Sequence, residues 1–178
     1  MTQAHIFISG GARSGKTALA EKLALRLGEA PAYLATAEAR DAEMAARIAA
    51  HRAARAERFT TIEEPLDLCG ALAATARTHD AVLIDCLTLW LSNLLGAGRD
   101  IDGEIGALVA TAEAIEATRI VFVSNEVGLG IVPENALARE FRDHAGRLNQ
   151  AVAALAAHAY FTVSGLPLVL KGTPPDEL

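Results

Sequence analysis

A glycine-rich segment near the start of the chain has the residue types of a phosphate-binding loop. Residues 10–17 match the pattern G-x-x-x-x-G-K-[ST], the P-loop. Glycines let the backbone pass close to an anion, so successive N–H groups can point at phosphate oxygens, and the following helix adds its positive N-terminal end. Lys16 would reach the β- and γ-phosphates as the catalytic cation, and the Thr17 hydroxyl would ligate Mg²⁺. The residues predicted to hold the phosphates are Gly10, Gly11, Ala12, Arg13, Ser14, Gly15, Lys16 and Thr17.

A P-loop also needs an acid at the end of a neighbouring strand, where it orients the water shell of the metal. Asp85 follows the apolar run 81–84, which is typical of a buried parallel strand. We therefore predict that Asp85 and Thr17 flank the Mg²⁺ site. Glu126 directly follows another strand-like run, residues 119–125, and is the second candidate for this role.

A histidine lies within a polar stripe on a predicted helix over residues 40–58. Glu43, Arg47, His51 and Arg55 recur at every fourth position, so they share one helix face. Arginines one turn away on either side would disfavour the imidazolium form of His51 and leave a nucleophilic nitrogen near pH 7. The same arginines could bind nucleotide phosphates. A solvated helix with an incidental histidine explains the spacing equally simply, so the residues alone leave both interpretations open.

The remaining histidines and both cysteines are expected to be structural or solvated. His5 begins a strand, His79 lies in a predicted turn, and His144 and His158 lie on or beside an alanine-rich helix. The two cysteines have neither the spacing of a metal site nor that of a disulfide framework, so we expect small core thiols.

The composition excludes several classes of protein. The net charge of −6 and the isoelectric point near 5.3 argue against a general nucleic-acid binder, so phosphate recognition must be local. The first residues lack the pattern of a signal peptide. The most apolar stretch, residues 81–95, is shorter than a bilayer span and contains Asp85. A cytoplasmic protein is the expectation.

Short apolar runs alternate with helical stretches along the whole chain. Strands are predicted at residues 6–9, 32–36, 59–62, 81–85, 119–125, 159–165 and 168–171, and helices after the P-loop and over residues 40–58 and 136–157. This alternation indicates βαβ units, hence an α/β fold with a mostly parallel sheet flanked by helices. No repeat or linker divides the chain, so residues 1–178 are expected to form one nucleotide-binding domain.

Four long blocks resemble one family closely. They are ISGGARSGKTALAE, YLATAEARDAEMAARIAAHRAAR, LIDCLTLWLSNLL and VSNEVGLGIVPENALAREFRDHAGRLNQ, and the resemblance continues to the final VSGLPLVLK. The family is the bifunctional adenosylcobinamide kinase / adenosylcobinamide-phosphate guanylyltransferase of cobalamin biosynthesis. It implies a RecA-like P-loop fold, assembly as a homotrimer, ATP and GTP as substrates with Mg²⁺, and two reactions. Adenosylcobinamide is phosphorylated first, and GMP from GTP is then transferred to that phosphate through a guanylyl-histidine.

The resemblance also implies site residues beyond the P-loop. The family's nucleophile lies in the element R-I-x-x-H-[KR], which places it at His51 here. Residues carried over as nucleotide contacts are Ala35, Thr36, Ala37, Arg52, Ala53, Ala54, Arg55, Glu63 and Asp85; the choice of Glu63 over the adjacent Glu64 rests on position. The alternatives are a plain small-molecule P-loop kinase with His51 on its surface, and a nucleotide-regulated binding protein. The loop 126–135 and the start of the next helix are the candidate corrinoid surface.

Overall fold

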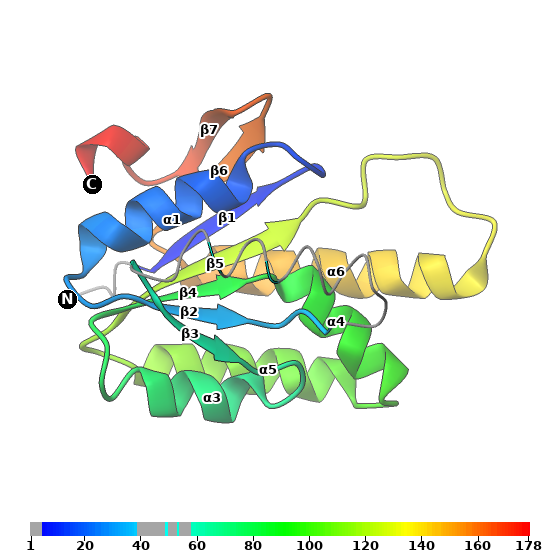
Figure 1. Cartoon of the computed structure of the whole chain (residues 1–178). Coiled ribbons are helices and arrows are strands. Elements are labelled where there is room, and N and C mark those ends of the chain that lie inside the picture. Colours follow the sequence, from blue (N-terminus) through cyan, green and yellow to red (C-terminus); the bar gives the residue numbers. More distant parts are fainter. Residues whose placement is uncertain (1–4, 39–48, 50–52, 54–57) are drawn as a thin grey trace.

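The computed structural model describes residues 5–38, 49, 53 and 58–178. Its centre is a seven-stranded sheet with the order β3-β2-β4-β5-β1-β6-β7 (Figure 1). The strands are β1 (Ile6–Gly10), β2 (Ala32–Ala35), β3 (Thr60–Glu63), β4 (Ala81–Asp85), β5 (Arg119–Asn125), β6 (His158–Val163) and β7 (Leu166–Lys171). Neighbouring strands are parallel except β6 and β7, which pair antiparallel as a hairpin. The predicted α/β class and mostly parallel sheet are confirmed.

Helices cover both faces of the sheet in the described part of the chain. They are α1 (Lys16–Leu27), α3 (Leu68–Thr75), α4 (Leu87–Gly96), α5 (Ile101–Ala114) and α6 (Ala136–Leu155), with a short 3-10 helix at Pro175–Glu177. Because side chains alternate along a strand, Ile6 and Ile8 pack with α1 on one face, whereas Phe7 packs on the other face with α3 to α6. Both cores are largely aliphatic.

The helix after the P-loop follows from its leucine spacing. Leu23 is fully buried, and Leu19 and Leu27 pack at the margin of the same core. The basic residue Arg26 lies in the last turn of α1, where it complements the negative end of the helix. None of the described helices combines the length and apolarity needed to cross a bilayer.

Several predicted boundaries differ from the structure. The strand predicted over residues 159–165 ends at Val163, because Ser164 and Gly165 adopt φ values of 53° and 82° and turn the chain into β7. The apolar run 81–95 divides into β4 and α4, and the sequence analysis also did not identify α3 and α5. The predicted helix over residues 40–58 lies outside the described residues, apart from Ala49 and Ala53, which are helical, and Arg58.

Candidate nucleotide and metal site

Those predicted site residues that the structure describes gather where the parallel strands have their carboxyl ends, at one edge of the sheet. Glu63, Ala35 and Asp85 are register partners at the carboxyl ends of β3, β2 and β4. Gly10, at the end of β1, is the partner of Asn125 on β5 and of Thr162 on β6. Ligands of open parallel sheets bind outside this edge, so the topology brings together groups that are far apart in the sequence.

The P-loop adopts a conformation that requires glycine at positions 10 and 15. Gly10 has φ 153°, and a Cβ added there would lie 2.5 Å from the Thr162 carbonyl oxygen. Gly15 has φ 98° and is the N-cap of α1, without any side-chain capping bond. The first backbone N–H groups of α1 have no intrahelical acceptors, which makes this helix start suited to an anion.

Lys16 is the cation of the site. Its side chain lies over the loop, and Nζ donates a 2.6 Å hydrogen bond to the Gly11 carbonyl. Only 7% of the residue is exposed, and this burial lowers the pKa of the amine, with nearby Asp85 acting in the opposite direction. A partly desolvated ammonium held against the loop binds phosphate more strongly than one in bulk water.

Thr17 and Asp85 form the predicted pair beside the P-loop. The Thr17 hydroxyl donates to Asp85 Oδ2 over 3.2 Å, and the Tyr33 hydroxyl donates to the same oxygen. A hydroxyl and a carboxylate are hard oxygen donors, as Mg²⁺ prefers, and two protein groups suffice because Mg²⁺ keeps several waters and phosphate oxygens. The residues present therefore fit a magnesium ion. Tyr33, which the sequence analysis missed, orients the carboxylate.

The other acid considered for this role points elsewhere. The Glu126 carboxylate accepts from the backbone N–H of Gly128 on its own loop, while the Glu126 N–H donates to the Gly10 carbonyl over 3.0 Å. Glu126 thus anchors its loop to the P-loop, and Asp85 is the acid in contact with Thr17.

Thr36 holds the backbone beside Asp85. It is fully buried; its hydroxyl donates to the Cys86 carbonyl over 2.8 Å and accepts from the Cys86 N–H over 3.0 Å. Asn93 from α4 donates to the Thr36 carbonyl over 2.8 Å. The Thr36 side chain thus fixes the chain after β4, while Ala35 and Ala37 lie on either side of it at the carboxyl end of β2.

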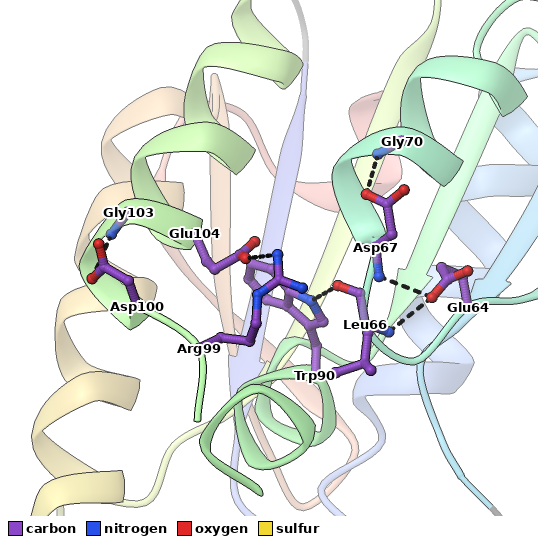
Figure 2. A network of polar contacts seen from close by, with 9 residues as sticks. All are labelled: Glu64, Leu66, Asp67, Gly70, Trp90, Arg99, Asp100, Gly103 and Glu104. Atoms are coloured by element: carbon purple, nitrogen blue, oxygen red, sulfur yellow. Dashed lines mark hydrogen bonds and ion pairs between the residues drawn. The ribbon is translucent and has the colours of Figure 1, made fainter. Parts of the chain in front are cut away.

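The structure distinguishes the two adjacent glutamates. Glu64 Oε1 accepts from the backbone N–H groups of Leu66 and Asp67, both over 2.9 Å, so it stabilises the turn before α3 (Figure 2). In the same network the Trp90 indole N–H donates to the Leu66 carbonyl over 3.0 Å. Glu63 is exposed at the end of β3, in register with Ala35. The choice of Glu63 as the nucleotide contact stays a prediction.

The predicted catalytic histidine and most of its neighbours lie outside the described residues. His51, Arg52, Ala54 and Arg55 belong to this group, and Ala53 is described only as helical and exposed. Their predicted roles therefore stay predictions.

His5, His158 and the two cysteines have the surroundings of structural groups. His5 is buried and bonds the Ala112 carbonyl and the Ile120 N–H, both over 3.2 Å. His158 accepts from the Thr173 N–H over 3.2 Å. Cys86 is buried and Cys69 half-buried, and burial raises the pKa of each thiol. Neither cysteine forms a disulfide in the described part of the chain.

An exposed apolar segment adjoins the site. The loop 126–135 leaves β5 at the edge that carries the P-loop, and its Ile131 is 97% exposed. Arg139 holds the far end of the loop by donating to the carbonyls of Pro133 and Glu134 over 2.9 and 2.7 Å. The exposed aliphatic residues of the loop and the first turn of α6 are Val127, Leu129, Ile131, Val132 and Leu137.

The chain is similar to known proteins over nearly its whole length. The chain is 50% identical to the bifunctional adenosylcobalamin biosynthesis protein CobP of Pseudomonas aeruginosa, over 94% of this chain and 97% of the relative. It is 42% identical to the bifunctional adenosylcobalamin biosynthesis protein CobU of Salmonella typhimurium, over 93% and 99%. Among solved structures, a prototypical ATPase from the type III secretion system of pathogenic bacteria matches 89% of this chain and 50% of its own. Its TM-score is 0.52 at 13% identity, which supports the fold alone.

The predicted RecA-like P-loop fold and the predicted resemblance are therefore both confirmed. The family described as cobinamide kinase / cobinamide phosphate guanyltransferase matches residues 6–170, and together with these relatives this shows that the chain belongs to that family.

Proposed function

We propose that this chain phosphorylates adenosylcobinamide with a nucleoside triphosphate and then transfers GMP from GTP to the new phosphate, giving adenosylcobinamide-GDP. The observation that carries the proposal is the P-loop with Lys16 against it and the Thr17–Asp85 pair beside it, in a member of this family. Both reactions consume a nucleoside triphosphate. A phosphate cradle next to a pair of hard oxygen donors meets that need.

In the kinase step the protein positions the reactants and neutralises negative charge. The N–H groups of the P-loop and the start of α1 bind the phosphate oxygens, while Lys16 offsets the charge that develops on the transferred group. Thr17 and Asp85 are the residues that would hold Mg²⁺, and the ion would supply positive charge that stabilises the negative charge of the phosphates. The substrate hydroxyl attacks the γ-phosphorus and the nucleoside diphosphate leaves.

We assign the guanylyl transfer to His51 as nucleophile. Its imidazole nitrogen attacks the α-phosphorus of GTP, the bond to the β-phosphate oxygen breaks, and pyrophosphate leaves. The phosphate oxygen of adenosylcobinamide phosphate then attacks the guanylyl-histidine and releases the imidazole. The support comes from the sequence, namely the stripe of Arg47, His51 and Arg55 and the family element around it.

The apolar loop 126–135 is the surface we propose for the corrinoid. The substrate hydroxyl must reach the P-loop, so the bulk of the macrocycle must lie over a neighbouring surface. The backbone hydrogen bond from the Glu126 N–H to the Gly10 carbonyl joins this loop to the P-loop, and Leu129 and Ile131 are 82% and 97% exposed.

Replacement of Ile131 by serine should raise KM for the corrinoid and leave KM for the nucleotide unchanged. Leu168→Ser, at an exposed position on β7, is the matched control.

Product analysis tests the proposal against its nearest rivals. Purified protein is incubated with adenosylcobinamide, ATP, GTP and Mg²⁺, with the label on the α-phosphate of GTP. Labelled adenosylcobinamide-GDP and free pyrophosphate support both activities. Phosphorylated corrinoid without retained label would indicate a plain kinase, and no product at all would indicate a binding protein.

Assembly as a homotrimer stays a prediction, to be measured by light scattering.

A further inference from the structure

The hairpin of β6 and β7 reaches the P-loop with its tip. In Figure 1 the hairpin lies beside the turn between β1 and α1. The Gly165 N–H donates to the Ser14 carbonyl over 2.9 Å, and a Cβ added to Gly15 would lie 3.1 Å from Gly165 Cα. Ser164 and Gly165 both have positive φ, as the two central residues of a tight hairpin turn do. The backbones of the two segments are therefore in direct contact.

A buried hydroxyl pair makes the second connection. Thr162 Oγ1 donates to the Ser9 carbonyl over 3.2 Å and lies 2.7 Å from Ser14 Oγ. A threonine hydroxyl has one proton, so Ser14 must be the donor in the shorter contact. Thr162 is 1% exposed and Ser14 is 7% exposed, so water does not compete for these bonds. The side chain of Ser14 is thereby turned into the protein, and its orientation is set from β6.

We propose that this hairpin tip, residues 162–165, holds the P-loop in its phosphate-binding conformation, with Thr162 and Gly165 as positioning residues for nucleotide binding. The inference rests on the proposed binding of the nucleotide phosphates by the P-loop. A loop with glycines at positions 10, 11 and 15 has many accessible conformations, and ordering them during binding weakens affinity. Contacts that fix the Ser14 backbone and side chain in advance reduce that entropic cost.

The test compares two substitutions at one buried position. Thr162→Val keeps the shape but removes the hydroxyl, whereas Thr162→Ser keeps the hydroxyl. Thr162→Val should raise KM for the nucleoside triphosphate and the dissociation constant of GDP about fivefold, as loss of a buried hydrogen bond predicts, with kcat and the corrinoid KM within about twofold of wild type. Thr162→Ser should restore the wild-type nucleotide KM.

A substitution at a distant threonine serves as the control that separates an effect on P-loop positioning from a general loss of stability. Thr118 is 3% exposed and donates to the Ala76 and His79 carbonyls over 2.8 and 2.9 Å. It directly precedes β5, so it lies at the amino ends of the parallel strands, opposite the P-loop. Thr118→Val should lower the unfolding midpoint without changing the nucleotide KM. A nucleotide KM for Thr162→Val within twofold of wild type, or an equal rise in Thr118→Val, would overturn the inference.

A second pair of variants serves if Thr162→Val does not fold. Gly165 and Gly98 have φ 82° and 66°, with nothing within 4 Å of an added Cβ, so alanine imposes similar backbone strain at both. Only Gly165→Ala should raise the nucleotide KM; equal effects would refute the proposal. Lys16→Ala in the same assay distinguishes failure of the proposed phosphate site from failure of the proposed role of the hairpin. If it retains nucleotide binding and both activities, the phosphate site itself is misplaced; if it loses them while the Thr162 and Gly165 variants behave as wild type, only the hairpin inference fails.

Discussion

Replacing Asp85 with asparagine should raise the Mg²⁺ concentration needed for activity while leaving the fold intact. Asp85 accepts hydrogen bonds from Thr17 and Tyr33, and an amide oxygen can still accept both. What the substitution removes is the negative charge that attracts the ion and its water shell. A hydrogen bond to a charged group contributes about 1.5–3 kcal/mol, and about 1.4 kcal/mol is tenfold in an equilibrium constant. Since Asp85 would act through water, we expect the lower end, about tenfold.

The assay is the initial kinase rate against Mg²⁺ at fixed ATP, for the wild type, Asp85→Asn and Asp80→Asn. Asp80 precedes β4, whereas Asp85 ends it, so their Cα atoms lie roughly 17 Å apart along the strand. Asp80 accepts from the Glu29 and Ala30 N–H groups and should affect stability alone. A half-saturating Mg²⁺ concentration that is unchanged in Asp85→Asn, or shifted equally in Asp80→Asn, would refute the assignment.

Three further predictions concern the cation, a buried histidine and the core. Lys16→Ala should reduce both activities by at least about a hundredfold; near wild-type rates would show that phosphates bind elsewhere. Burial lowers the pKa of His5, and its Nδ1 accepts from Ile120, so the unfolded chain binds the proton more readily. The unfolding free energy should therefore fall as pH drops below about 6.5. In His5→Gln, the unfolding free energy measured by urea titration should depend less steeply on pH, and the same pH dependence as in the wild type would contradict this reasoning. Trp90→Phe should cost about 2–3 kcal/mol in urea unfolding, because it leaves a cavity and an unpaired Leu66 carbonyl, and a loss below about 0.5 kcal/mol would contradict the packing argument.

The parts of the site that are contiguous in sequence could be predicted from it. The P-loop is one segment of glycines, lysine and threonine, so its chemistry is visible without the fold. Asp85 could be identified because a buried parallel strand is a continuous apolar run, and its acid comes directly after. The pairing of Thr17 with Asp85 then follows from strand order.

Contacts between distant segments could not be predicted in this way. Thr162 meets Ser14 across 148 residues, and nothing in the local pattern of β6 marks that threonine. Tyr33 resembles any other strand aromatic until the sheet places its hydroxyl on Asp85. Two segments of chain meet at each of these positions, and only the folded topology brings them together.

The missed helices have physical explanations of the same kind. The α4 segment is apolar on nearly all sides and continues directly from β4, so periodicity cannot separate the two. The α5 segment has weak amphipathicity and several glycines and alanines. Its start is marked by the N-cap Asp100, whose side chain accepts from the Gly103 N–H over 3.3 Å. That capping residue before an apolar run was the signal that could have identified α5.

Intact-mass measurement after incubation with GTP and Mg²⁺, without corrinoid, tests the central claim most directly. The wild type should gain one GMP per chain, through a bond that is labile in acid and stable in base, as a phosphoramidate is. Peptide mapping should place the GMP on His51, and His51→Ala should lose both the adduct and guanylyl transfer while keeping kinase activity, because phosphoryl transfer to the corrinoid hydroxyl needs no histidine nucleophile. GMP on another residue, or an adduct that persists in His51→Ala, would contradict the account.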